Sequence, residues 1–178
     1  MYKTKLGVLA FLMAAILIGC SSTRKSPDVS DNIRKSLDQA GLKDVTVSQD
    51  RDKGVVTLGG HVARDEDKAE AETLAKSDAA GQVVANQIAV VPPNDKSEAK
   101  TVNSDLDKGI EKNLDAALVQ NHLKKDVKYD VKNGVVTLTG DVNSEAKRGQ
   151  AEKVAGSVPN VQQVVNELEV KHRKASSS

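Results

Sequence analysis

Two similar series of apolar positions run along this chain of 178 residues. Each series begins with apolar residues at intervals of four, which predicts a helix with one buried face. These positions are Val29, Ile33 and Leu37 in the first series and Leu106, Ile110 and Leu114 in the second. The chain therefore contains an internal repeat, and each copy begins with a helix. The first helix is expected to start at Ser26 and Pro27 and to end at Gly41, and the equivalent helix is expected at residues 104–118.

A valine-rich run bounded by glycines follows the helix in each copy. Residues 53–62 read KGVVTLGGHV, and residues 133–142 read NGVVTLTGDV. A turn dipeptide before β-branched residues is typical of the returning strand of a β-hairpin. The other strand of each hairpin is expected at residues 45–48 and 127–131.

An alanine-rich helix and an alternating strand complete each copy. The helices are expected at residues 65–77 and 144–157, and the strands at 84–90 and 164–170. At a constant spacing Ala71, Ala75, Asn86, Ile88 and Val90 recur as Ala151, Ala155, Asn166, Leu168 and Val170. The predicted fold class is α+β, with two tandem αββαβ modules, each a small three-stranded mixed sheet packed against two helices. The pattern leaves open whether the two modules pack together.

This order of elements resembles the BON domain, found twice. The resemblance rests on the strand GVVTLxGxV, the alanine-rich helix and the final V-x-N-x-[IL]-x-V, and it covers nearly all of the chain after about Ser26. BON domains occur in bacterial envelope proteins and are associated with phospholipid binding. The whole chain resembles an outer-membrane lipoprotein with two BON domains.

The N-terminus has the pattern of a secretory signal peptide. Lys3 and Lys5 precede an apolar run at 6–18, which is shorter than the roughly 20 residues that a membrane span needs. Leu-Ile-Gly-Cys at 17–20 resembles a bacterial lipobox, which implies cleavage before Cys20 and acylation, including palmitate, of that residue. Ser21 suggests sorting to the outer membrane of a Gram-negative bacterium. The alternative is a chance cysteine in an uncleaved anchor or an ordinary signal peptide.

The chain is thus expected to divide into six segments. They are a signal peptide at 1–19, a lipidated tether at 20–26, a first BON domain at 27–91, a linker at 92–102 that opens with two prolines, a second BON domain at 103–171 and a disordered tail at 172–178.

The amino-acid composition argues against a nucleic-acid partner. Lys and Arg total 26 against 25 Asp and Glu, whereas nucleic-acid binders normally carry a basic excess. Tyr129 is the only aromatic residue after the signal segment, so no platform for stacking bases is available. We therefore expect no nucleic-acid partner.

No set of residues predicts catalysis. The three histidines have no partner at the spacing of a metal site or a catalytic triad, and the repeated glycines bound a strand instead of opening a helix. The prediction is a protein that is not an enzyme and needs no metal or cofactor. For Asn86 and Asn166 we expect local hydrogen bonds to the backbone that fix the start of the last strand, with a ligand role as the less favoured alternative.

Candidate lipid contacts come from the places where the two copies differ. The second copy has a longer loop before its hairpin, with apolar residues next to two lysines, and its second helix is more basic than that of the first copy. The candidates are Leu123, Lys124, Lys125, Lys147 and Arg148. The alternatives are that Leu118 and Leu123 cap the core and that the charged helix face is simply solvated.

The expected function is that of a lipid-anchored periplasmic protein that binds anionic phospholipid and supports outer-membrane integrity under envelope or osmotic stress. The alternative is an adaptor that binds other envelope proteins without direct contact with phospholipid, for which exposed sheet edges would suffice. The sequence does not indicate the oligomeric state.

Overall fold

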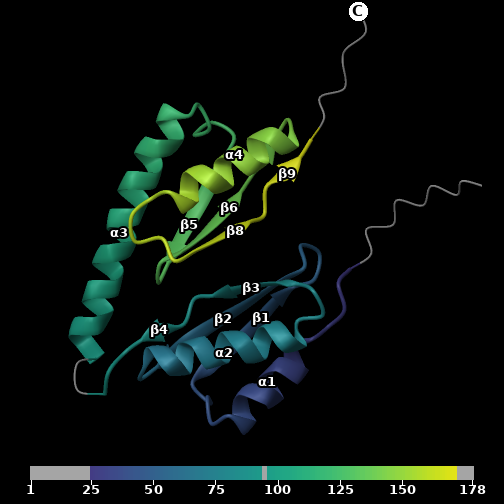
Figure 1. Cartoon of the computed structure of the whole chain (residues 1–178), viewed down its shortest axis with the longest axis vertical. Coiled ribbons are helices and arrows are strands. Elements are labelled where there is room, and N and C mark those ends of the chain that lie inside the picture. Colours follow the sequence, from purple (N-terminus) through teal and green to yellow (C-terminus); the bar gives the residue numbers. More distant parts are fainter. Residues whose placement is uncertain (1–24, 94–95, 172–178) are drawn as a thin grey trace, which may run out of the picture.

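The computed structural model describes residues 25–93 and 96–171, so the predicted signal peptide, Cys20 and the tail at 172–178 lie outside the described residues. The chain forms two αββαβ modules, as predicted (Figure 1). Module 1 contains α1 (Ser30–Gln39), β1 (Val45–Asp50), β2 (Val55–Val62), α2 (Asp65–Asp78), β3 (Val83–Asn86) and β4 (Ala89–Val90). Module 2 contains α3 (Lys96–Gln120), β5 (Lys128–Lys132), β6 (Val135–Thr139), β7 (Asp141–Val142), α4 (Glu145–Gly156), β8 (Gln163–Asn166) and β9 (Glu169–Val170).

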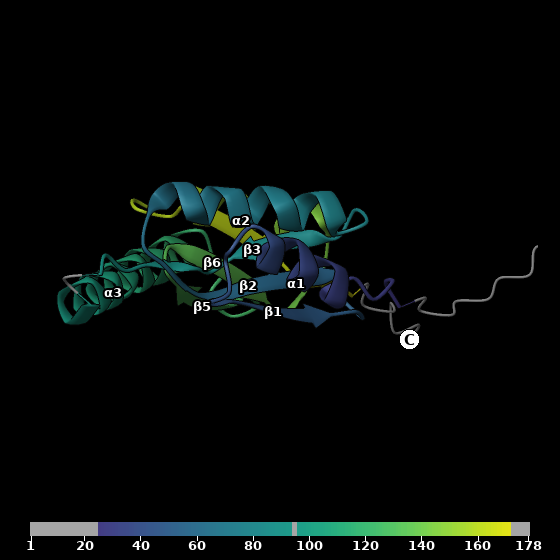
Figure 2. The same cartoon turned by 90° about the horizontal axis from the view of Figure 1, so that it is seen from below.

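Each module has a mixed sheet built around its returning hairpin strand. In module 1 the order is β1-β2-β3, with β1 antiparallel and β3 parallel to β2. In module 2 the order is β5-β6-β8 with the same directions. The helices α1 and α2 contact each other and pack on the sheet of module 1, and Figure 2 shows α2 lying along these strands.

The last strand of each module is interrupted, whereas the sequence predicted one continuous strand. Asn86 closes β3, and its Oδ1 accepts a hydrogen bond from the backbone N of Ile88 at 3.4 Å. Its Nδ2 donates to Lys68 O at 3.2 Å and to Glu72 Oε2 at 3.0 Å, both on α2. The same three bonds are made by Asn166 to Leu168, Arg148 and Glu152. The expected local hydrogen bond is therefore confirmed, but it ends a strand instead of starting one.

Replacing Asn86 with alanine should destabilise the protein by about 1–3 kcal/mol, because the buried N–H of Ile88 loses its acceptor and the bonds that join the strand to α2 are lost. Chemical denaturation measures this loss, and Asn166→Ala should behave similarly. Asn143→Ala is the matched control, since Asn143 is exposed. Equal stability of Asn86→Ala and the control would contradict the structural role.

The glycine that ends the repeated motif is required by a close backbone approach. Gly60 has a φ of +86° and Gly140 a φ of +122°, which favours glycine. A Cβ atom at either position would overlap a backbone oxygen, that of Asp44 or Asp126. The chain segment before each hairpin is thereby held against the end of the returning strand.

The turns of the two hairpins differ in length. In module 2 the register Lys132↔Val135 leaves only Asn133 and Gly134 in the turn, both with positive φ as a tight hairpin turn requires. In module 1 the register Asp50↔Val55 leaves the four residues 51–54. The hairpin turn of module 1 is thus two residues longer.

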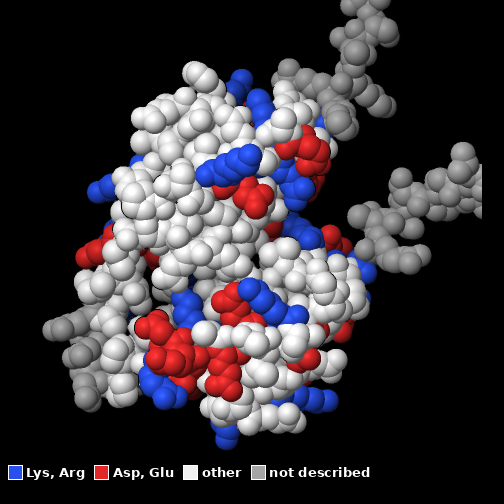
Figure 3. All heavy atoms as spheres, in the orientation of Figure 1, with Lys and Arg blue, Asp and Glu red and all other residues white. Residues whose placement is uncertain are grey.

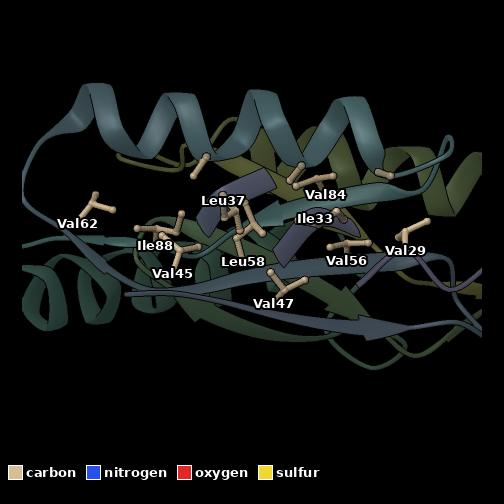
Figure 4. Close-up of a cluster of buried hydrophobic side chains, with 13 residues drawn as sticks. Val29, Ile33, Leu37, Val45, Val47, Val56, Leu58, Val62, Val84 and Ile88 are labelled. Carbon is tan, nitrogen blue, oxygen red and sulfur yellow. The ribbon is translucent and has the colours of Figure 1, made fainter. Parts of the chain in front are cut away.

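A separate core of aliphatic side chains fills each module. In module 1 the inward-facing residues of α1, the sheet and α2 meet, as Figure 4 shows for Ile33, Leu37, Val56 and Leu58. In module 2 the equivalent cluster includes Val136, which is fully buried. The predicted burial of the repeated strand is confirmed in both copies.

Two helices begin elsewhere than predicted. The serine and proline at 26 and 27 were expected to start the first helix, but α1 begins at Ser30, and residues 25–29 before it have no regular secondary structure. In module 2 the expected start was near Ser104, yet α3 begins at Lys96. Residues 96–103 contain neither glycine nor proline, so nothing in that part of the predicted linker stops the helix.

The two modules pack together through equivalent surfaces. Val55 and Ala85 of module 1 form a buried cluster with Val135 and Val165, their counterparts in module 2. Two polar contacts flank this cluster: Lys53 Nζ lies 2.5 Å from Glu167 Oε2, and Asn133 Nδ2 donates to Gln87 O at 2.8 Å. Lys53 and Asn133 occupy equivalent positions in the two modules, and so do Gln87 and Glu167. Such reciprocal contacts are the mark of an approximate two-fold arrangement.

The interface contacts of Gln163 lack a counterpart. The Gln163 side chain of module 2 accepts a hydrogen bond from Asn86 N at 3.0 Å and donates to Val84 O at 2.7 Å, so it binds the outer edge of β3. The equivalent position in module 1 is Val83, which is 48% exposed and cannot make these bonds. The edges of β3 and β8 therefore face each other, which the sequence had left open.

Candidate functional site

The candidate lipid contacts of module 2 come from two segments that the fold brings together. Residues 121–127 join α3 to β5, and the other segment is the first turn of α4. Asp126 lies in the loop, and its Oδ2 accepts a hydrogen bond from Lys147 Nζ at 3.2 Å. Ser144 caps α4, accepting a hydrogen bond from Lys147 N at 3.3 Å, which fixes the position of this first turn. Lys124, Lys125, Lys147 and Arg148 are called the basic cluster below.

Leu123 does not belong to this surface. It is 1% exposed and lies in the core of module 2 together with Leu118. A membrane contact through its side chain would require Leu123 to leave that core. The proposal that Leu123 contacts lipid is therefore wrong, and both leucines cap the core under the loop.

Lys124 is paired within its own module. Its Nζ forms an ion pair with Asp115 on α3 and lies 4.7 Å from the centre of the Tyr129 ring. The hydrogen bond to Asp115 raises the pKa of Lys124, and the same bond lowers the pKa of Asp115. Burial raises the pKa of Tyr129, whose hydroxyl lies 3.0 Å from Asp115 Oδ1. Both members of the ion pair are therefore charged at neutral pH.

Arg148 is held loosely. Its Nη2 lies 3.4 Å from Asn166 O, and its Nη1 lies 3.5 Å from Glu145 Oε2. Its Nε has no hydrogen-bond partner among the described residues. Both contacts are long for a guanidinium, which forms its strongest bonds at about 2.7–2.9 Å. The Nη groups therefore retain capacity to bind an external anion.

Carboxylates offset most of the charge of the basic cluster. Asp115, Asp126 and Glu145 contact three of its four cations, which leaves one net positive charge. Lys125 is exposed and has no ion-pair partner among residues 25–93 and 96–171. In Figure 3 most of the visible face of module 2, in the upper half of the view, is uncharged, and its blue and red groups lie next to one another.

The family model of the BON domain matches residues 26–92 and 106–172. The chain belongs to the BON domain family. It is similar to Osmotically-inducible protein Y of Escherichia coli (strain K12), with 29% identity over 137 residues that cover 76% of this chain and 67% of that relative.

Two solved structures of CdsD, a structural protein of the type III secretion system of Chlamydia trachomatis, resemble the chain at 16% identity. The match to the first structure covers 81% of this chain and 92% of the CdsD chain, with a TM-score of 0.38. The match to the second structure, the C-terminal domain of CdsD, covers 83% of this chain and 100% of that domain, with a TM-score of 0.35.

The two BON modules differ in charge at the start of their second helices. In module 1 the first turn of α2 carries Asp65, Glu66 and Asp67, whereas the first turn of α4 carries one acid, Glu145. Figure 3 shows acidic atoms gathered over the start of α2, in the lower half of the view. An anionic surface would therefore be repelled at this end of module 1 and not at the equivalent end of module 2.

The described parts of the two BON modules contain neither a candidate metal site nor a helix that could span a membrane. Within residues 25–93 and 96–171 no three His, Cys, Asp or Glu side chains are placed to hold a metal ion. In the same ranges no helix combines the length and apolar character needed to cross a membrane.

Sequence patterns missed the acidic partners of the basic cluster. Asp126 follows the two lysines directly, but its pairing with Lys147 depends on the contact between the loop and α4. Asp115 lies nine residues before Lys124, too far for a prediction from helical spacing. Asp115, on the first helix of module 2, thus neutralises part of the basic cluster.

Proposed function

We propose that this BON protein is anchored through an acylated Cys20 at the periplasmic face of the outer membrane. Module 2 contacts anionic phospholipid there without catalysing a reaction. The observation that carries the lipid contact is the junction of the loop 121–127 with α4, which gathers four cations at one end of module 2. Near an anionic membrane each such cation contributes about 1 kcal/mol. The neighbouring carboxylates keep this attraction weak, so acyl chains provide the attachment and the cluster orients the module.

A role in outer-membrane integrity under osmotic stress follows from the same proposal. The similarity to a relative whose name is Osmotically-inducible protein Y supports this role. A protein fixed to the membrane by acyl chains would meet its lipid headgroups continuously, so even a weak charged contact would be occupied.

Reversing the charge of the basic cluster should abolish most binding to anionic lipid. Lys124, Lys125, Lys147 and Arg148 are replaced together with glutamate in the water-soluble protein that lacks residues 1–20. Flotation with phosphatidylglycerol vesicles at low salt measures binding, which should fall at least about tenfold if two cations contribute about 1 kcal/mol each. Vesicles of neutral lipid should bind neither protein.

The matched control reverses four exposed cations of module 1, namely Lys35, Lys43, Arg64 and Lys76. It carries the same change in net charge, yet it should retain most of the binding. Equal losses in both variants, or no loss in either, would contradict a lipid contact through module 2. A thermal melt of each variant verifies that it is folded.

An adaptor function is the second candidate, and the edges of the sheets support it. β3 and β8 face each other, but β1 and β5 end their sheets on the opposite sides. An extended segment of another envelope protein could add to either edge through backbone hydrogen bonds. If the water-soluble protein fails to float with anionic vesicles at low salt, this function is favoured over the lipid contact.

A further inference from the structure

The segment before α1 is fixed to the hairpin turn of module 1. Ser26 N donates to Arg51 O at 2.8 Å, and Arg51 Nε donates back to Ser26 O at 2.8 Å. Lys25 Nζ lies 3.3 Å from Asp52 Oδ1. Arg51 and Asp52 belong to the turn that is two residues longer than its counterpart in module 2. The additional length of this turn thus supplies the groups that hold the segment.

A second set of contacts holds Pro27 and Val29. The Gln49 side chain donates from Nε2 to Pro27 O at 2.8 Å and accepts from Val29 N at 3.2 Å. Gln82 Nε2 also donates to Pro27 O, at 3.0 Å. In the hairpin of module 2 the position equivalent to Gln49 is Val131, which is buried and apolar. Residues 25–29 together with these partners are called the N-terminal latch.

The latch limits how far module 1 can lie from an acylated Cys20. Five residue steps separate Cys20 from Lys25, and an extended chain spans at most about 3.5 Å per residue, or about 18 Å in total. The hairpin turn of module 1 would therefore stay within that distance of the lipid headgroups. The other end of β2 is farther away, because eight strand residues span about 26 Å.

The approximate two-fold arrangement places the opposite end of module 2 beside this turn. Lys53, the neighbour of Asp52, pairs with Glu167 of module 2. Asn166, which precedes Glu167, contacts Arg148 through its backbone oxygen. In Figure 1 the N-terminal segment accordingly enters on the side of β9 and the start of α4.

We propose that the N-terminal latch fixes the orientation of the protein on an anionic phospholipid bilayer. The hairpin turn of module 1 and the basic cluster of module 2 then face the headgroups together. Each cation of the turn is paired with a carboxylate: Lys25 with Asp52, Arg51 with Asp28 and Lys53 with Glu167. Asp50, which accepts hydrogen bonds from the turn backbone, adds a further negative charge, so the turn itself carries no positive excess. The turn therefore fixes how the protein is positioned at the membrane, and the basic cluster supplies the electrostatic attraction to the headgroups. This inference rests on the proposed acylation of Cys20.

Single labels on the acylated protein test the orientation. Acylation consumes the only thiol of the chain, so one introduced cysteine can be labelled with a fluorophore. Ala80→Cys and Asn143→Cys mark the end expected at the membrane, and Glu66→Cys and Lys132→Cys mark the opposite ends of the same two modules. All four positions are exposed. The protein is reconstituted into phosphatidylglycerol-containing vesicles with a quencher on the lipid headgroup.

The labels at positions 80 and 143 should lose most of their fluorescence, and those at 66 and 132 should lose little. Adding Gln49→Val and Arg51→Ala removes the bonds that these two side chains make to residues 26–29. This change should reduce the difference without releasing the protein from the vesicles. Equal quenching at all four positions of floating protein would overturn the orientation alone. Failure of the intact protein to float would overturn the anchoring, and the orientation with it.

Discussion

Replacing Val136 with aspartate is expected to abolish the cooperative unfolding of module 2. Val136 is completely buried in the middle of β6, where a carboxylate would have neither water nor a partner. The expected cost is at least about 4 kcal/mol, which approaches the total stability of a small domain. Circular dichroism during thermal unfolding of the water-soluble protein measures this loss.

Two further variants give this prediction its controls. Val56→Asp changes the equivalent buried position of module 1 and should be about as harmful. Val102→Asp changes a valine of α3 that is 56% exposed, and it should alter stability by no more than about 0.5 kcal/mol. A normal melt of Val136→Asp would show that the burial of β6 is misassigned.

Replacing Cys20 with alanine should remove the mature protein from the outer membrane. Stable attachment needs about two acyl chains, each buried methylene contributing about 0.8 kcal/mol, and no weak contact of the basic cluster can replace that energy. The variant should accumulate as unprocessed precursor or as soluble protein. Membrane fractionation and the mass of the mature chain measure the outcome.

Ser22→Ala provides the control for this second prediction, because it leaves the cysteine and its neighbours in place. It should be processed and attached like the unchanged protein. If Cys20→Ala still yielded protein of mature size in the outer-membrane fraction, the proposed lipoprotein anchor would be wrong.

The packing of the two modules has a consequence for any function at the membrane. Because Gln163 and the buried cluster of Val55, Ala85, Val135 and Val165 join the modules, the protein would meet a bilayer as one unit. The N-terminal latch acts on module 1, yet its effect would extend to Arg148 through the contact between Lys53 and Glu167. The residues that orient the protein on the bilayer and the residues that attract it there can therefore lie in different modules.

The sequence alone determined the elements whose signals are local. The repeat, the four hairpin strands and the helices α2 and α4 follow from the alternation of valines, the position of glycines and the spacing of alanines. The end of α1 just before Gly41, which has a φ of +80°, also followed from the sequence, because few other residues adopt that conformation easily. Burial of Val136 followed from its place in the strand.

Only the tertiary structure decided the features that depend on contacts between distant residues. The serine and proline at 26 and 27 have the pattern of a helix start, but bonds to Arg51 and Gln49 hold them outside the helix. Leu123 is buried because the loop folds onto the core, and Lys147 joins the loop lysines because Asp126 lies beside the end of β6. A periodic pattern reports which face of an element is buried, and it does not report which other element covers that face.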